Sequence, residues 1–174
     1  MDFFTNIDRK ILIFININLK CKILDIIMPL ITYLASSIAV MIYCVVSLLL
    51  YKKYHDERIL TFSIAVLVSC ILVKILKKLL SRQRPFEIIK TLNVRKIGID
   101  KFSFPSGHTS VAFAIATASF FISIYLFSIC IILAILVGFS RMYIGVHYPS
   151  DVTIGAIVGF VSAYIVYIYL IPVL

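Results

Sequence analysis

Long apolar runs, separated by short polar segments, form the dominant pattern of this sequence. The stretch from Ile26 to Tyr51 contains no charged residue, and a second run, 59–80, carries lysines only toward its end. A helix needs about 20 apolar residues to cross a bilayer. We therefore expect membrane-spanning helices at 26–51 and 59–80, joined by a charged loop.

A third apolar run extends from Phe102 to Ser140 without any Asp, Glu, Lys or Arg. Because each helical residue rises about 1.5 Å, this run is too long for one crossing. We expect two helices here, 106–125 and 128–143, joined by a tight turn. A short polar patch follows, and the last apolar run predicts a helix at 152–173.

The first 22 residues have a different pattern. A helix in this segment places its apolar side chains on one face, which is typical of a helix lying in the membrane interface; a frayed terminus is the alternative. The apolar face consists of Phe3, Ile7, Ile11, Phe14 and Ile15. Residues 1–174 are thus predicted to form one all-α domain, a polytopic membrane bundle of about five transmembrane helices plus an interfacial helix at 1–22.

Composition excludes a soluble globular protein. Hydrophobic residues make up 62% of the chain and charged residues 14%, whereas soluble domains are about half apolar and about a quarter charged. A chain of 174 residues cannot bury that much apolar surface in a soluble core. The cysteines form no CxxC pair, and we interpret them as apolar filler and not as a disulfide or metal framework. They are Cys21, Cys44, Cys70 and Cys130.

The net charge of +9 indicates an anionic partner. Nucleic acid is not expected, because the basic residues lie between membrane-length apolar runs. Anionic membrane lipids and phosphorylated substrates remain. Five crossings would bring three polar clusters to one face: Lys77–Pro85, Pro105–His108 and Ser140–Asp151. Ionisable residues in membrane segments are costly and usually functional.

Each cluster taken alone has an ordinary explanation. Lys77 and Arg84 lie seven residues apart, two helical turns, so we expect that they can share one helix face and hold an anion. Lysine and arginine also reach from span ends to the membrane surface, which is the alternative. Pro105 and Ser106 are typical of a helix start, whose free N–H groups bind phosphate. His108 alone could be an ordinary interfacial histidine.

The third cluster adds a possible nucleophile. Asp151, four residues after His147, could accept a hydrogen bond from the imidazole and leave the other ring nitrogen with a lone pair. Alone, this pair could be structural or half of a metal site. Together, three cations, a helix N-terminus and two histidines predict a pocket for a tetrahedral dianion, in which one histidine attacks phosphorus and the other protonates the leaving oxygen.

These residues resemble the three-part signature of the type 2 phosphatidic acid phosphatase superfamily, which also includes the vanadium haloperoxidases. The matching parts are Lys77-x6-Arg84-Pro85, Pro105-Ser106-Gly107-His108 and Ser140-Arg141-x5-His147-x3-Asp151. The resemblance implies that His147 is the nucleophile, Asp151 its orienting partner and His108 the general acid. It implies phosphate binding by Lys77, Arg84, Ser106, Gly107 and Arg141. The resemblance implies that no metal and no cofactor are needed. Haloperoxidase activity is not expected either, since the haloperoxidases are mostly larger and soluble.

The short chain is similar to small bacterial members of this superfamily. The resemblance implies an integral membrane enzyme that hydrolyses a phosphomonoester or pyrophosphate of a lipid, such as undecaprenyl pyrophosphate, phosphatidylglycerophosphate or phosphatidic acid. A lipid A 1-phosphatase is the alternative enzyme. Gly107 stands where some undecaprenyl pyrophosphate enzymes have Asp, which leaves the substrate open, and the sequence does not determine the oligomeric state.

Two functions other than catalysis are compatible with an apolar, basic membrane protein. A channel or small transporter would carry polar residues at mid-membrane, whereas here they gather at span ends. A binder of anionic lipid would explain the charge but would not need both histidines and Asp151.

The basic loop 86–104 either borders the entry to the site or is solvated.

Two indications disagree about the side of the membrane on which the site lies. Most basic residues fall on the face of the three clusters, which by the positive-inside rule would be cytoplasmic. Several of those cations are needed for phosphate, so they are poor topology markers. By resemblance to bacterial members, we expect the inner (plasma) membrane, with the site on the extracytoplasmic face.

Overall fold

The computed structural model describes the backbone of residues 2–170 and the side chains of residues 6–169. Within these residues the chain is helical and contains no strand. The elements are α1 (Asp2–Ile13), the π-helical η1 (Phe14–Asn18), α2 (Lys22–Tyr33), α3 (Ser37–Tyr54), α4 (Glu57–Leu80), α5 (Pro85–Ile88), α6 (Gly107–Phe120), α7 (Ile124–Tyr143) and α8 (Pro149–Leu170). The predicted all-α membrane bundle is confirmed.

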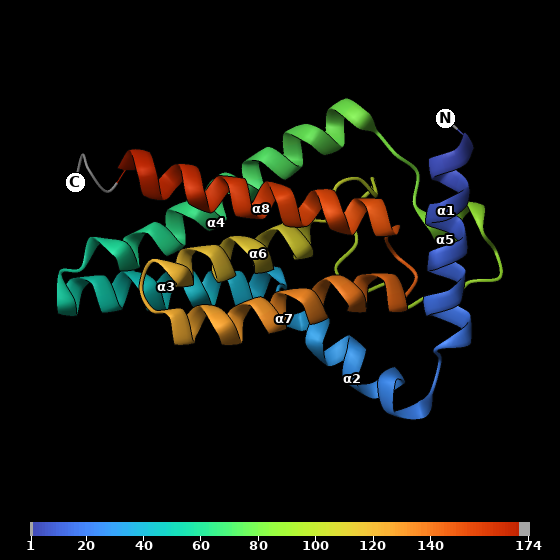
Figure 1. The fold of residues 1–174 in the computed structure, drawn as a ribbon, viewed down its shortest axis with the longest axis horizontal. Coiled ribbons are helices and arrows are strands. Elements are labelled where there is room, and N and C mark those ends of the chain that lie inside the picture. The colour runs from blue at the N-terminus through green and yellow to red at the C-terminus, as the bar shows by residue number, and fades with distance from the viewer. Residues whose placement is uncertain (1, 171–174) are drawn as a thin grey trace.

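Helices α3, α4, α6, α7 and α8 run side by side, and α1 crosses one end of this bundle (Figure 1). Four stretches in the described part are long and apolar enough to span a membrane: Ser37–Tyr54, Glu57–Ile88, Ile124–Tyr143 and Pro149–Tyr169. The 14 residues of α6 extend only about 21 Å. This helix packs against α4, α7 and α8 inside the bundle, and five crossings remain a prediction.

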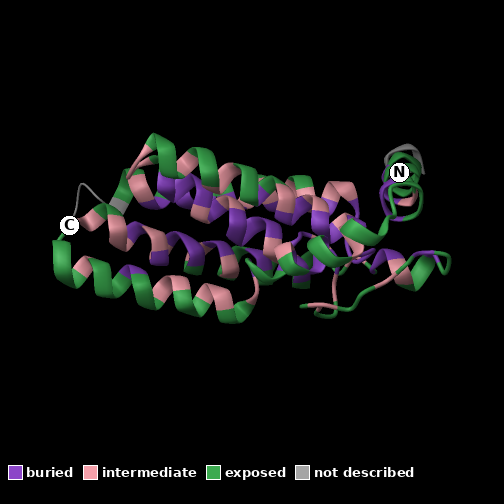
Figure 2. Ribbon diagram, turned by 90° about the horizontal axis from the view of Figure 1, so that it is seen from below, coloured by how far each residue is buried: buried purple, intermediate pink, exposed green. Residues whose placement is uncertain are grey.

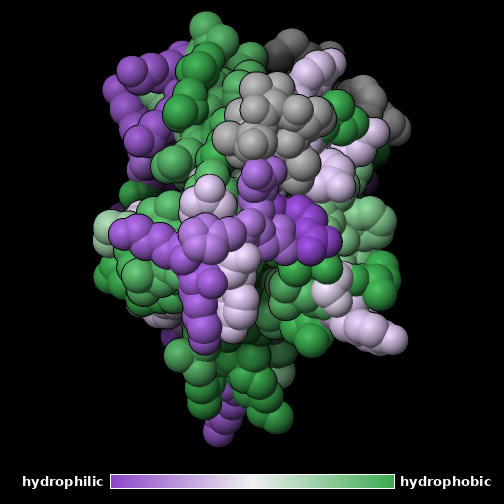
Figure 3. Space-filling view, turned by 90° about the vertical axis from the view of Figure 1, so that its left-hand side faces the viewer, coloured by the Kyte–Doolittle hydropathy of each residue, from purple (hydrophilic) through white to green (hydrophobic). Residues whose placement is uncertain are grey.

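The bundle turns its large apolar side chains outward. Exposed residues line the outer faces of the long helices, while buried residues lie between them (Figure 2). Leu49, Ile71, Ile132 and Ile157 are each about half exposed or more, a pattern that suits lipid and not water. The end of the bundle away from α1 is largely hydrophobic with a hydrophilic band (Figure 3); its charged loop is Lys52–Arg58.

Close packing of α6 on α8 fixes the positions of their N-termini. Two glycines of α8 make the approach possible, because a Cβ at Gly155 would lie 2.6 Å from the Ser106 carbonyl oxygen and one at Gly159 2.1 Å from that of Ser110. The Ser106 amide donates a hydrogen bond to the Asp151 carbonyl (2.9 Å). The second and third polar clusters are thereby held together.

The N-terminal segment is attached to the same end. The Asn16 side-chain amide donates to the carbonyls of Tyr143 (2.6 Å) and Asn93 (2.9 Å), while Leu12 is fully buried. Of the predicted apolar face, Ile7, Ile11 and Phe14 are exposed, whereas Ile15 is buried against Tyr143 and Ile144. The interfacial location of this helix stays a prediction. The side chain of Phe3 lies outside the described residues.

Three boundaries differ from the sequence prediction. The range 26–51 is not one helix: α2 ends at Tyr33 and α3 begins at Ser37, because the Ser36 side chain caps α3 by accepting from the Ala39 amide (3.3 Å). The turn between α6 and α7 lies at 121–123 and not at 125–128, closed by the Ser123 amide on the Ser119 carbonyl (2.9 Å).

The last helix begins at Pro149, three residues earlier than predicted, because proline suits the first helical position. Residues 171–173 of the predicted range 152–173 lie outside the described residues.

The substitution Gly159→Ala tests the contact between α6 and α8. We expect it to destabilise the bundle by about 1–3 kcal/mol, because the new Cβ has to displace the backbone of α6. Thermal unfolding in detergent measures the effect. Ile157→Ala, on the exposed face of the same helix, is the control and should have a smaller effect. A Gly159→Ala protein as stable as its parent would contradict the packing described here.

Candidate active site

The three polar clusters converge on one cavity of ≈ 540 Å³. Polar residues reach it from the end of α4, the start of α6 and the link between α7 and α8, toward the end of the bundle that α1 crosses (Figure 1). Five of the eight predicted site residues line it: Lys77, Arg84, Gly107, His108 and His147. The remaining three, Ser106, Arg141 and Asp151, are fully buried behind it. The structure therefore brings the predicted set together, while the roles of its members remain to be tested.

His147 lies in the link between α7 and α8, and Asp151 lies in the first turn of α8. The imidazole Nδ1 is 3.4 Å from the Asp151 carboxylate, and Nε2 points to the other side, 3.5 Å from Arg84 Nη1. The tautomer with a proton on Nδ1 would leave the lone pair of Nε2 facing Arg84. Burial, with a smaller contribution from the charges of Arg141 and Arg84, lowers the pKa of His147 to about 3. The ring is therefore neutral at neutral pH.

The Asp151 carboxylate is held by several donors. It accepts hydrogen bonds from the Tyr148 amide (2.8 Å), the Ser103 hydroxyl and Arg82 Nη1 (2.6 Å). A carboxylate with this many partners is fixed in place and can orient the imidazole.

Lys77 and Arg84 reach the cavity by a route that the sequence did not predict. They do not share a helix face, because α4 ends at Leu80 with Ser81 in a left-handed conformation (φ 44°) and Arg84 lies beyond it, just before α5. Both cations nevertheless meet at one oxygen: Lys77 Nζ and Arg84 Nη2 donate to Asp100 Oδ1 at 2.9 and 2.7 Å.

Asp100 was missed in the sequence because it is an isolated acidic residue in a basic loop. Partial burial alone would raise the pKa of this carboxyl, but its hydrogen bonds and charge contacts with Lys77 and Arg84 outweigh burial and lower the pKa. The two cations thus form a site that holds an anion.

Arg141 and His108 both lie next to Gly98, which lines the same cavity. Arg141 donates to the Thr32 hydroxyl (2.7 Å) and to the Gly98 carbonyl (3.2 Å). Among the buried side-chain nitrogen and oxygen atoms of the described residues, only Arg141 Nε and His108 Nε2 have no hydrogen-bond partner. Buried polar atoms without partners are uncommon and point to a ligand or a functional role. Arg141 is one of the residues predicted to bind phosphate, and His108 is the predicted general acid.

Both polar groups of Ser106 make hydrogen bonds within the protein. The Ser106 hydroxyl accepts from the Thr109 hydroxyl (2.9 Å), and the Ser106 amide donates to the Asp151 carbonyl. Gly107 lines the cavity, so the N-terminus of α6 approaches it there.

Arg82 and Asp8 are further residues that sequence reasoning missed. Arg82 donates to Asp151 Oδ1 (2.6 Å) and to Asp8 Oδ2 (2.8 Å) and stacks over the Tyr148 ring at 4.1 Å. Asp8 comes from α1 and also accepts from the Ser150 amide (2.9 Å). The only sequence signal was the position of Arg82 inside the first basic cluster. The network couples α1 to the carboxylate that faces His147.

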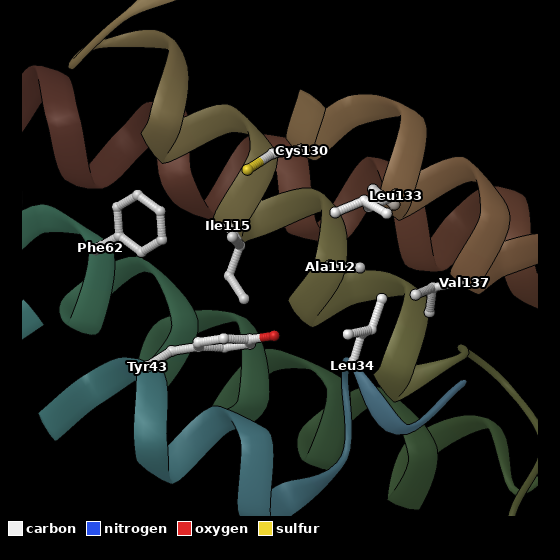
Figure 4. Close-up of a pocket in the computed structure, with 9 residues that line it drawn as sticks. Leu34, Tyr43, Phe62, Ala112, Ile115, Cys130, Leu133 and Val137 are labelled. Carbon is white, nitrogen blue, oxygen red and sulfur yellow. The ribbon is translucent and has the colours of Figure 1, made fainter. Parts of the chain in front are cut away.

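The cavity is polar at one end and apolar along its flank. The flank lies between α3 and α4 and includes Val40, Met41, Leu67 and Cys70. Met41 and Leu67 are more than half exposed, so this flank opens toward the surface that faces lipid. A second cavity of ≈ 310 Å³ lies where side chains from α3, α4, α6 and α7 converge (Figure 4). Its lining is almost entirely apolar and includes Tyr43, Phe62 and Leu133.

Within the described residues, no group of three or more His, Cys, Asp or Glu side chains is arranged to hold a metal ion. The chemistry that the arrangement supports is attack by a neutral imidazole on a phosphorus atom held by cations.

Comparison with known proteins gives one family. The PAP2 superfamily model matches residues 57–172. The bacitracin transport permease protein BcrC of Bacillus licheniformis is 40% identical over 60% of this chain and 51% of its own length, and an undecaprenyl-diphosphatase of Sulfolobus acidocaldarius is 30% identical over 66% and 56%. The chain thus spans about half the length of these relatives.

Two further relatives match over more of their length. A lipid A 4'-phosphatase of Bacteroides thetaiotaomicron is 28% identical over 96% of this chain and 78% of its own. The crystal structure of Aquifex aeolicus LpxE superposes with a TM-score of 0.81 at 28% identity, covering 92% of this chain and 94% of that one.

Replacement of Arg82 tests its link to His147 through Asp151. In Arg82→Gln we expect the pKa of His147 to rise, because a cation is lost beside the carboxylate that stabilises the imidazolium. Titration of the histidine ¹⁵N resonances by NMR measures this, with Arg95→Gln, an exposed arginine of the same end of the bundle, as the control. An unchanged His147 titration in Arg82→Gln would show that Arg82 has only a structural role.

Proposed function

The chain belongs to the PAP2 superfamily, and from this membership and the geometry of the site we propose that it is an integral membrane lipid phosphatase. It hydrolyses a phosphomonoester or pyrophosphate of a lipid through a phosphohistidine intermediate. The aligned relatives named as phosphatases support this class of reaction.

One observation carries the proposal: a single cavity joins a cationic end, where His147 lies, to an apolar flank between α3 and α4. Lys77 and Arg84 are suited to phosphate oxygens, and the flank is suited to a lipid tail. A free sugar phosphate or nucleotide would gain nothing from the flank, whereas a lipid phosphate fits both ends.

The proposed reaction has two steps. His147 Nε2 attacks phosphorus, the bond to the leaving oxygen breaks, and the imidazolium form of His108, which the negative charge of the bound phosphate favours, donates its proton to that oxygen. Water then attacks the phosphohistidine with His108 as base, which breaks the N–P bond and releases phosphate. Lys77, Arg84 and Arg141 neutralise the charge on the phosphoryl oxygens in both steps, and Asp151 holds the His147 ring in position.

The proposed substrate is a lipid phosphate, and several related lipids are candidates. Relatives named for undecaprenyl diphosphate and for lipid A both support candidates. One observation favours lipid A as the substrate: the match to a lipid A 4'-phosphatase covers almost the whole of this chain. Undecaprenyl pyrophosphate, phosphatidylglycerophosphate and phosphatidic acid complete the panel to be tested.

Phosphate release from this lipid panel in detergent tests the function. We expect release from at least one lipid, to a similar extent with and without a chelator. His147→Asn should lower the rate by about a thousandfold or more, because the covalent route is lost. The matched control is His55→Asn, at the opposite end of the bundle, where asparagine tolerates the left-handed backbone of this position (φ 53°).

Full activity in His147→Asn would refute the nucleophile, and loss of activity with the chelator would refute the metal-independent reaction. Absence of release from every lipid would refute the function itself and would favour a lipid-binding protein or a transporter.

We further propose that the site faces the extracytoplasmic side of a bacterial inner membrane. The charge count that opposes this includes cations engaged in the site, among them Lys77, Arg82, Arg84 and Arg141. Because these cations have partners within the site, they are poor markers of membrane topology.

Cysteine labelling in intact cells tests this orientation. Arg95→Cys should react with a membrane-impermeant maleimide and Lys53→Cys should not, in a background that lacks the four native cysteines, since Cys21 is exposed near the active end. The opposite labelling pattern would place the site in the cytoplasm.

A further inference from the structure

The loop between α5 and α6 places a carboxylate of the chain itself on the two cations of the site. We propose that Asp100 is a resident anion that competes with the substrate phosphate, and that the segment Gly98–Phe102 has to release Lys77 and Arg84 before a lipid phosphate binds. This inference rests on the proposed function, because it takes these two cations as the phosphate-binding pair.

The position of the carboxylate is the first argument. Asp100 Oδ1 accepts from Lys77 Nζ at 2.9 Å and from Arg84 Nη2 at 2.7 Å, so one oxygen bridges both cations. A phosphate oxygen bound by the same pair would occupy the same place. A phosphate oxygen that bridged both cations from this position would have to displace the carboxylate oxygen.

The backbone of the same segment is the second argument. The Gly98 carbonyl accepts from Arg141 Nη2 (3.2 Å), the Asp100 carbonyl from Arg84 Nε (2.8 Å) and the Phe102 carbonyl from Lys77 Nζ (2.7 Å). All three cations predicted to bind phosphate therefore donate to this short segment. It covers the phosphate site as a strap.

The strap also covers the proposed general acid. Gly98 packs against His108 so closely that a Cβ would lie 2.6 Å from ring atom Cε1, and its φ of +54° suits glycine. Release of the strap would therefore expose the ring of His108 together with the cations. Binding of the phosphate and access to the acid would be parts of one movement.

The chain is held by hydrogen bonds on both sides of the strap, while the strap itself is exposed at Asp100. Before the strap, the Arg95 amide donates to the Ile144 carbonyl (3.1 Å), and after it the Ser103 amide donates to the Arg82 carbonyl (2.9 Å). The Asp100 side chain is 58% exposed, whereas those of Lys77 and Arg84 are 9% and 2% exposed. The carboxylate can thus move into water while the cations stay buried.

The exchange is favourable on electrostatic grounds. Buried cations without a partner are strongly destabilising, so Asp100 pairs them when no substrate is bound. A phosphate brings more charge and more acceptor oxygens than a carboxylate and replaces it without leaving the cations unpaired. The apparent affinity for phosphate is then the intrinsic affinity multiplied by the fraction of molecules in which the strap is released.

Binding of inorganic phosphate to the whole protein in detergent tests the proposal without turnover. Asp100→Asn should bind phosphate about tenfold more tightly than the wild type, measured by calorimetry and by the phosphate-dependent rise in melting temperature. Asp56→Asn is the matched control, since Asp56 pairs with Arg58 at the opposite end of the bundle and asparagine also caps a helix. Asp100→Ala is a second variant, in case the new amide makes its own contacts.

Unchanged or weaker phosphate binding in both Asp100 variants would overturn the proposal, and weaker binding would show that Asp100 positions the cations. With an active lipid substrate, Asp100→Asn should also lower KM. If the wild type releases phosphate from no lipid, the proposed function fails, while tighter phosphate binding by Asp100→Asn would still support the competing anion.

Discussion

Cations that are buried at the end of a membrane bundle need anionic or polar partners, and this requirement organises the active end of the protein. Arg82 is paired with Asp151 and Asp8, and Lys77 and Arg84 share Asp100. Because an isolated buried charge would be strongly destabilising, these pairs fix the relative positions of α1, α4, α8 and the loop before α6. The site is therefore built by the same contacts that hold this end together.

The pairing also explains how a neutral histidine is kept beside several cations. Burial and the nearby arginines lower the pKa of His147, while Asp151 limits the shift and fixes the ring. Asp151 can do this because its own charge is stabilised by Arg82 and by the Tyr148 amide. Close packing of α6 on α8, made possible by Gly155 and Gly159, brings His108 to the same cavity.

The sequence was sufficient for the parts of this account that depend on local pattern. Apolar runs predicted the helices, and the spacing of His147 and Asp151 predicted a pair that lies at 3.4 Å. It was not sufficient where contacts are long-range: nothing near Asp8 or Asp100 in the chain indicates that these carboxylates meet Arg82 and Arg84. The break at Ser36 was missed because an uncharged run was read as one helix, although serine is a common helix cap.

We propose that His147 carries the phosphoryl group during turnover, and trapping the intermediate tests this. After reaction with a hydrolysable lipid phosphate, the sample is quenched in base, where phosphohistidine is stable, and mass spectrometry locates the modified residue. We expect phosphate on His147 in the wild type and none in His147→Asn. Phosphate on another residue, or turnover without any phosphorylated intermediate, would contradict it.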